Sequence, residues 1–245
     1  MTTPLAPAVD VLAVAAHRDD VELLCGGTLA RAADQGYRTG ILDLTRGEMG
    51  TAGSADLRGA EADDAAAALG VAARRNAGFP DAGLENSIEA RHHVAAYLRA
   101  FRPTVVILPY IKGRHPDHRV AAELAGDACF LAGLKKLPIE GEPHRPTKIL
   151  YSLAYREDAV KPTFVVDITE QMERKMAAVA CYHSQFEGKT WAGEVFPGGD
   201  RPLYEQVRMH AAHAGSLIRT EFGEPFYTHE TVQIDDIVSL GVRSL

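Results

Sequence analysis

Two apolar runs, each followed by a cluster of histidine and aspartate, constrain the fold of this chain more than any other feature. Residues 9–16 (VDVLAVAA) precede residues 17–20 (HRDD), and residues 104–110 (TVVILPY) precede residues 115–118 (HPDH). Short apolar runs bounded by polar residues are typical of buried parallel strands. Because the carboxyl ends of parallel strands meet at one edge of an open α/β sheet, we expect both clusters to lie there together.

The remaining sequence alternates between strand and helix patterns, which predicts an α/β protein. The central sheet is expected to be mostly parallel, within a Rossmann-like three-layer fold. No linker or repeat interrupts the 245 residues, so we expect one domain over residues 1–245. Further strands are predicted at residues 40–45, 73–79, 148–155, 164–168 and 231–238, and helices at residues 22–35, 56–69, 88–101, 120–134, 169–183 and 203–217.

Composition excludes several classes of protein. The net charge of −7 and the absence of a basic stripe argue against a nucleic-acid partner. No apolar run approaches the roughly 20 residues that span a bilayer, and the first ten residues lack the pattern of a signal peptide. The three cysteines lack metal-type spacing, as expected in a reducing compartment. We therefore expect a cytoplasmic protein without a membrane partner.

The residue types in the two clusters suit a metal ion. His17 and Asp20 are three residues apart, as are His115 and His118, so each pair can face one point. Imidazole and carboxylate suit zinc with one coordination position left open for water. Taken singly, the aspartates could cap a helix and the histidines could be solvated. The presence of both clusters after apolar strands favours a metal site.

A glycine-rich segment and a later loop are candidates for contacts with a ligand or another subunit. Residues 46–54 (RGEMGTAGS) contain three glycines and precede Arg58, which shares a predicted helix face with Glu61. Arg58 could form a surface ion pair or reach a polar substrate. Residues 188–202, rich in glycine and proline, are predicted to form a loop near the site or at a subunit contact.

These motifs resemble those of a known family, the LmbE-like or PIG-L zinc-dependent N-acetylglucosamine deacetylases. The family begins with Ala-His-Pro-Asp-Asp before a Gly-Gly pair, and residues 16–20 (AHRDD) precede residues 26–27 (GG) here. Residues 44–51 (LTRGEMGT) with Arg58 and Glu61 look like its second block, and residues 115–118 look like its third. Similarity to the bacillithiol-pathway branch, N-acetylglucosaminyl L-malate deacetylase, is carried by residues 19–22 (DDVE), 113–118 (GRHPDH), 164–168 (FVVDI) and 182–186 (YHSQF).

The resemblance implies a ligand set and catalytic roles. His17, Asp20 and His118 would hold one Zn²⁺ per chain, although Fe²⁺ is also compatible with these ligands. Asp19 would be the general base for a water activated at the metal. Protonated His115 would stabilise the oxyanion, and Asp117 would orient and charge His115.

Two arginines are the candidates for substrate binding. The resemblance implies that Arg58 and the glycine-rich loop grip the sugar. Arg18 replaces the proline of the family motif. Its charge could weaken binding of a cation, or it could attract an anionic arm of the substrate.

The expected reaction is hydrolysis of an N-acetylglucosamine conjugate, a small-molecule amino sugar, that releases acetate. N-acetylglucosaminyl L-malate is the first candidate substrate. An inositol glycoside, a chitin oligomer and a thiol conjugate are the alternatives. A metal-free binding module for a sugar nucleotide is the rival from another class, and it would not need both clusters. By analogy with the family we expect a homo-oligomer, a trimer or a hexamer.

Overall fold

The computed structural model describes residues 6–50, 52–154, 160–187 and 201–242. In these ranges the chain forms a seven-stranded sheet in the order β3-β2-β1-β4-β5-β7-β6. β1 to β5 are parallel, and β7 runs antiparallel to both β5 and β6. The strands are β1 (Val11–Ala15), β2 (Thr39–Thr45), β3 (Ala73–Phe79), β4 (Val105–Pro109), β5 (Lys148–Ser152), β6 (Phe164–Asp167) and β7 (Gly223–Tyr227).

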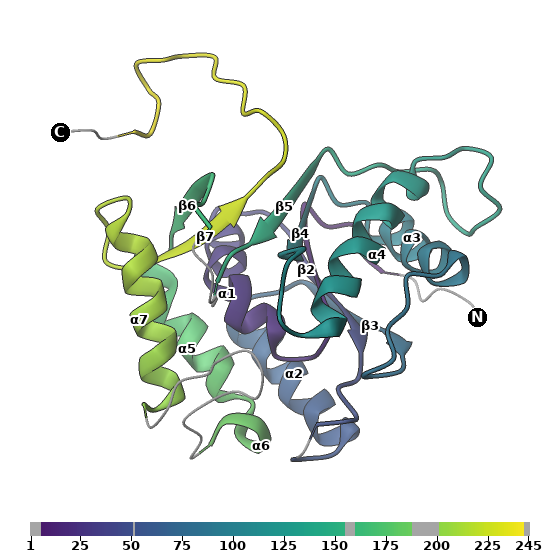
Figure 1. Ribbon diagram of the computed structural model, residues 1–245, viewed down its shortest axis with the longest axis horizontal. Coiled ribbons are helices and arrows are strands. Elements are labelled where there is room, and N and C mark those ends of the chain that lie inside the picture. The colour runs from purple at the N-terminus through teal and green to yellow at the C-terminus, as the bar shows by residue number, and fades with distance from the viewer. Residues whose placement is uncertain (1–5, 51, 155–159, 188–200, 243–245) are drawn as a thin grey trace.

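Helices cover both faces of the sheet and complete a three-layer α/β fold (Figure 1). Alternation along β1 assigns the faces: Leu12 and Val14 pack with α3 and α4, whereas Ala13 and Ala15 pack with α1. The helical elements are α1 (Asp20–Asp34), α2 (Ala55–Leu69), α3 (Ile88–Phe101), α4 (Pro116–Ala132), the 3₁₀ turn η1 (Thr169–Gln171), α5 (Met172–Ala180), α6 (His183–Phe186) and α7 (Leu203–Ser216). None of the described helices has the length and apolarity needed to cross a membrane.

The strand predicted at residues 231–238 is wrong. These residues are irregular and exposed, and they follow a strand that the sequence pattern did not indicate, β7. Val232 and Ile237 have β-branched side chains, but no strand of the sheet pairs with this segment, and they are 54% and 82% exposed. In Figure 1 the segment leaves the body of the molecule as a yellow loop. The loop predicted at residues 188–202 lies outside the described residues, apart from residues 201 and 202.

Helix α1 is interrupted at Cys25, whose φ and ψ of −153° and 20° are not helical. The interruption releases backbone N–H groups from the helix, and a buried carboxylate accepts from them. Gly27 donates to Glu224 Oε1 at 3.0 Å, and Thr28 donates to Glu224 Oε2 at 2.7 Å. Lys175 Nζ lies 2.5 Å from Glu224 Oε1, and both side chains are 1% exposed. β7 and α5 therefore hold the helix that begins at the candidate metal site.

Candidate active site

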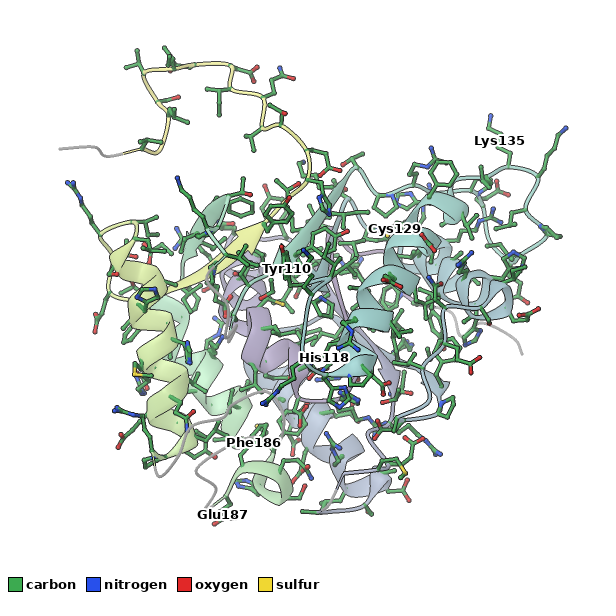
Figure 2. All side chains as sticks on the ribbon, in the orientation of Figure 1. Tyr110, His118, Cys129, Lys135, Phe186 and Glu187 are labelled. Atoms are coloured by element: carbon green, nitrogen blue, oxygen red, sulfur yellow. The ribbon has the colours of Figure 1, made fainter. Side chains whose placement is uncertain are left out.

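The three predicted metal ligands converge at the carboxyl edge of the sheet. His17 follows β1, Asp20 begins α1, and His118 lies in the first turn of α4. His118 Nε2 lies 3.3 Å from His17 Nδ1 and 3.2 Å from Asp20 Oδ1, and Asp20 Oδ2 lies 3.5 Å from His17 Nδ1. A tetrahedral zinc ion with bonds of about 2.0–2.1 Å separates its ligand atoms by about 3.4 Å. These donors therefore fit such an ion (Figure 2 labels His118 at the start of α4).

The third ligand is placed by the way α4 begins. His115 is the N-cap residue and Pro116 occupies the first turn, where its missing N–H costs no hydrogen bond. The helix starts four residues before the predicted start at residue 120, so the segment 115–118 is a cap and a first turn rather than a loop. His118 is thereby held by a helix and not by a solvated connection.

Asp19, the predicted general base, lies beside the ligand set in an unusual conformation. Its φ of 93° is in the left-handed region, which residues other than glycine seldom adopt. Its carboxylate accepts a hydrogen bond of 3.0 Å from Arg58 Nη2. Burial raises the pKa of Asp19 to about 7, against the opposing effect of Arg58. A carboxylate with this pKa can exchange a proton near neutral pH.

Two carboxylates face the other nitrogen of His17. Asp81 Oδ1 lies 3.0 Å and Asp117 Oδ2 lies 3.4 Å from His17 Nε2. Burial lowers the pKa of His17, but hydrogen bonds to Asp117, Asp20 and Asp81 outweigh it and raise the pKa to about 12. The carboxylates thus stabilise positive charge at this ring. A divalent cation bound at Nδ1 would be stabilised by the same negative charges.

Burial also raises the pKa of Asp81, but its hydrogen bonds to His17 and to the N–H of Met49 outweigh burial and bring the pKa to about 2. Asp81 therefore carries its negative charge throughout the neutral range. Asp81 was not identified from the sequence as a site residue. It follows the carboxyl end of β3, so the rule that side chains after parallel strands meet at one edge of the sheet also applies to it.

His115 lies against the two histidine ligands, with its ring centroid 4.8 Å from that of His17 and 4.8 Å from that of His118. Burial and the two neighbouring rings lower the pKa of His115, which favours a neutral imidazole. The backbone N–H of Asp117 donates to His115 Nδ1 at 3.2 Å, so the neutral ring carries its proton on Nε2. The carboxylate of Asp117 instead accepts from the backbone N–H of Ala82 at 2.8 Å.

The two arginines predicted to bind substrate both make contacts within the protein. Arg58 is 5% exposed and donates from Nη1 to the carbonyl oxygen of Gly47 at 2.6 Å, besides its contact with Asp19. Arg18 donates from Nη1 to the carbonyl oxygen of Ala55, in the first turn of α2. Arg58 thus joins the candidate base to the glycine-rich loop. Contact of either arginine with a substrate stays a prediction.

Comparisons with known proteins agree on one family. The family model described as PIG-L, GlcNAc-PI de-N-acetylase, matches residues 12–129, a range that contains every candidate site residue. A diacetylchitobiose deacetylase from Thermococcus kodakarensis is 33% identical over 205 residues, which cover 77% of this chain and 74% of that protein. A probable N-acetyl-alpha-D-glucosaminyl L-malate deacetylase 2 from Bacillus cereus is 29% identical over 192 residues, covering 72% of this chain and 84% of that protein. The solved structure of the conserved protein TT1542 from Thermus thermophilus is 42% identical, with a TM-score of 0.83, and covers 92% of this chain and 97% of that one.

Proposed function

Because the chain belongs to the PIG-L family and is a deacetylase of N-acetylglucosamine conjugates, we propose that it hydrolyses the acetamide with one Zn²⁺ held by His17, Asp20 and His118. One observation carries the proposal. His118 Nε2, His17 Nδ1 and the carboxylate of Asp20 lie 3.2–3.5 Å from one another, with Oδ1 of Asp20 nearest His118 and Oδ2 nearest His17. A second carboxylate, that of Asp19, with a pKa of about 7, lies beside them. When bound, the ion would polarise the acetamide carbonyl and lower the pKa of a water molecule. Fe²⁺ is the alternative ion, since imidazole and carboxylate also suit it.

Asp19 supplies the base in this proposal. Its carboxylate accepts the proton of the attacking water and later returns it to the leaving amine of the glucosamine. The hydrogen bond from Arg58 holds the carboxylate in one orientation, and its charge favours the ionised form at neutral pH. Arg58 therefore positions the base in addition to its predicted contact with the sugar.

His115 stabilises the developing oxyanion as a donor from Nε2. We replace the protonated ring expected from the sequence with a neutral one, because burial and two neighbouring histidines lower its pKa. The backbone N–H of Asp117 donates to Nδ1, so the neutral ring keeps its proton on Nε2. A neutral imidazole with Nε2–H still donates a hydrogen bond to negative charge that grows on the carbonyl oxygen. With a neutral ring, the proposal no longer has the Asp117 carboxylate charge His115, and it keeps only the predicted role of Asp117 in orienting that ring.

The proposed substrate is N-acetylglucosaminyl L-malate, as in the bacillithiol pathway. Lys112 and Arg114 are exposed on the loop between β4 and α4, directly before His115, and Arg18 lies between His17 and Asp19. Positive charge on residues next to His17 and His115 in the sequence suits a glycoside that carries carboxylates. Diacetylchitobiose is the second candidate, supported by the 33% identity to the Thermococcus deacetylase. We further propose a single domain, a cytoplasmic location and a homo-oligomer, as a trimer or hexamer.

Acetate release from a substrate panel tests the function. The purified chain is assayed with N-acetylglucosaminyl L-malate, diacetylchitobiose, an inositol glycoside and plain N-acetylglucosamine, each with and without a chelator. The proposal expects the malate conjugate to give the highest kcat/KM and the chelator to abolish turnover. Preference for diacetylchitobiose would favour the second candidate. Turnover that survives complete removal of metal would exclude the proposed centre, and a protein that binds sugar nucleotides without metal would support the rival class.

A further inference from the structure

The β3–α3 turn, residues 80–83, holds His17 from the side opposite the ligand set. Asp81 Oδ1 lies 3.0 Å from His17 Nε2, closer than the 3.4 Å of Asp117 Oδ2. His17 therefore presents one nitrogen to Asp20 and His118 and the other to a carboxylate. A carboxylate behind a histidine ligand fixes the orientation of the ring and raises its basicity toward the metal.

The second oxygen of the same carboxylate reaches the glycine-rich loop. Asp81 Oδ2 accepts from the backbone N–H of Met49 at 2.9 Å, and the N–H of Asp81 donates to Glu48 Oε1 at 3.0 Å. The side chain of Met49 is 67% exposed, so the loop gains little burial at this point. These two hydrogen bonds tie the loop to the carboxylate that holds His17.

The turn that presents Asp81 has an unfavourable backbone. Ala82 has a φ of 60°, in the left-handed region that a residue with a Cβ seldom adopts. In this conformation its N–H donates to Asp81 Oδ1 and to Asp117 Oδ2, each at 2.8 Å. One backbone amide thus holds both carboxylates that face His17 Nε2.

From these contacts we propose that Asp81 is a positioning residue that orients His17 for the metal and couples it to the glycine-rich loop through Met49. The inference rests on the proposed metal centre. In this arrangement the position of the loop and the affinity for the metal depend on each other through one carboxylate. A shift of the loop that breaks the bond to Met49 also frees Asp81 to turn away from His17.

Two variants at Asp81 and one matched control test the proposal in the chain of residues 1–245. Asp81→Ala removes the carboxylate contacts with His17, Met49 and the N–H of Ala82. Asp81→Asn keeps an oxygen but removes the charge. Glu85→Gln removes one negative charge from an exposed position in the same β3–α3 connection. Two quantities are measured on protein whose folding is checked by circular dichroism. They are the Kd for Zn²⁺, by competition with a chromophoric chelator, and the hydrogen-exchange rate of the Met49 amide without metal.

We expect Asp81→Ala to weaken Zn²⁺ binding roughly 10- to 100-fold, and to speed exchange of the Met49 amide. Asp81→Asn should weaken Zn²⁺ binding less, because its amide oxygen can still accept from His17. Glu85→Gln should match wild type in both measurements. Asp81→Ala protein that binds Zn²⁺ as tightly as wild type would overturn the orienting role, and unchanged exchange at Met49 would overturn the coupling to the loop. A wild-type chain that binds no Zn²⁺ would instead refute the metal centre itself.

Discussion

Arg58 and Asp19 form an ion pair with Nη2 and Oδ2 3.0 Å apart and side chains only 6% and 13% exposed. Of the groups around Asp19, the guanidinium is the strongest influence that lowers its pKa against the effect of burial. The pair therefore sets the pH at which the candidate base is ionised.

Removal of this charge should shift the pH profile. In Arg58→Met the pKa of Asp19 rises further, since burial is no longer opposed by the guanidinium. The reaction needs the carboxylate, so the acidic limb of kcat/KM against pH should move to higher pH. Arg58→Lys is the matched control, because it keeps a positive charge and should keep the limb near its wild-type position. A limb that stays in place in Arg58→Met would show that Asp19 is not the group that titrates.

Asp19→Ala should separate catalysis from metal binding. Asp19 is outside the ligand set, so the variant is expected to retain its Zn²⁺, while kcat falls by roughly 10²- to 10⁴-fold without the general base. Acetate release and metal content are measured on the same preparation. A variant with wild-type turnover would exclude Asp19 as the base.

His118→Ala should remove the metal, because only His17 and Asp20 remain to hold it. These two residues both come from the short segment that follows β1 and begins α1. Elemental analysis after dialysis should find the variant depleted of Zn²⁺. His213→Ala, at an exposed position on α7, is the matched control and should remain loaded. Full metal content in His118→Ala would mean that the ligand set is misassigned.

The buried Lys175–Glu224 pair should govern stability and not chemistry. Lys175→Met leaves the carboxylate buried without its cation, which we expect to cost roughly 3–5 kcal/mol of unfolding free energy. Adding Glu224→Gln should recover part of that loss, because the amide oxygen still accepts from the α1 backbone. Glu173→Gln, in the exposed pair with Arg208, is the control and should leave Tm unchanged. Equal Tm values for Lys175→Met and wild type, measured by thermal unfolding, would contradict this role.

The features that sequence predicted correctly depend on local patterns. β3 was predicted with its observed bounds, and the proximity of His17, Asp20 and His118 was predicted by one rule about strand ends. Their role as metal ligands stays a prediction. Each of these conclusions needs only nearby residues or a general property of parallel sheets.

The features that sequence missed depend on distant partners. β7 contains Gly223 and Pro225, which are uncommon in strands, and it is a strand because β5 and β6 pair with it on either side. The interruption of α1 at Cys25 is stable because Glu224 accepts from the released amides nearly 200 residues later in the sequence. No local pattern around residue 25 contains that information.

The dependence of α1 on Glu224 has a consequence for biosynthesis. A nascent chain that has emerged as far as residue 129 already contains all the candidate ligands, yet Gly27 and Thr28 still lack the acceptor that arrives with residues 223–227. The half of the molecule that carries the candidate ligands therefore reaches its final shape only after residues 223–227 have been synthesised. Deletion of residues 223–227 should therefore disturb the candidate site, although every residue of that site is still present.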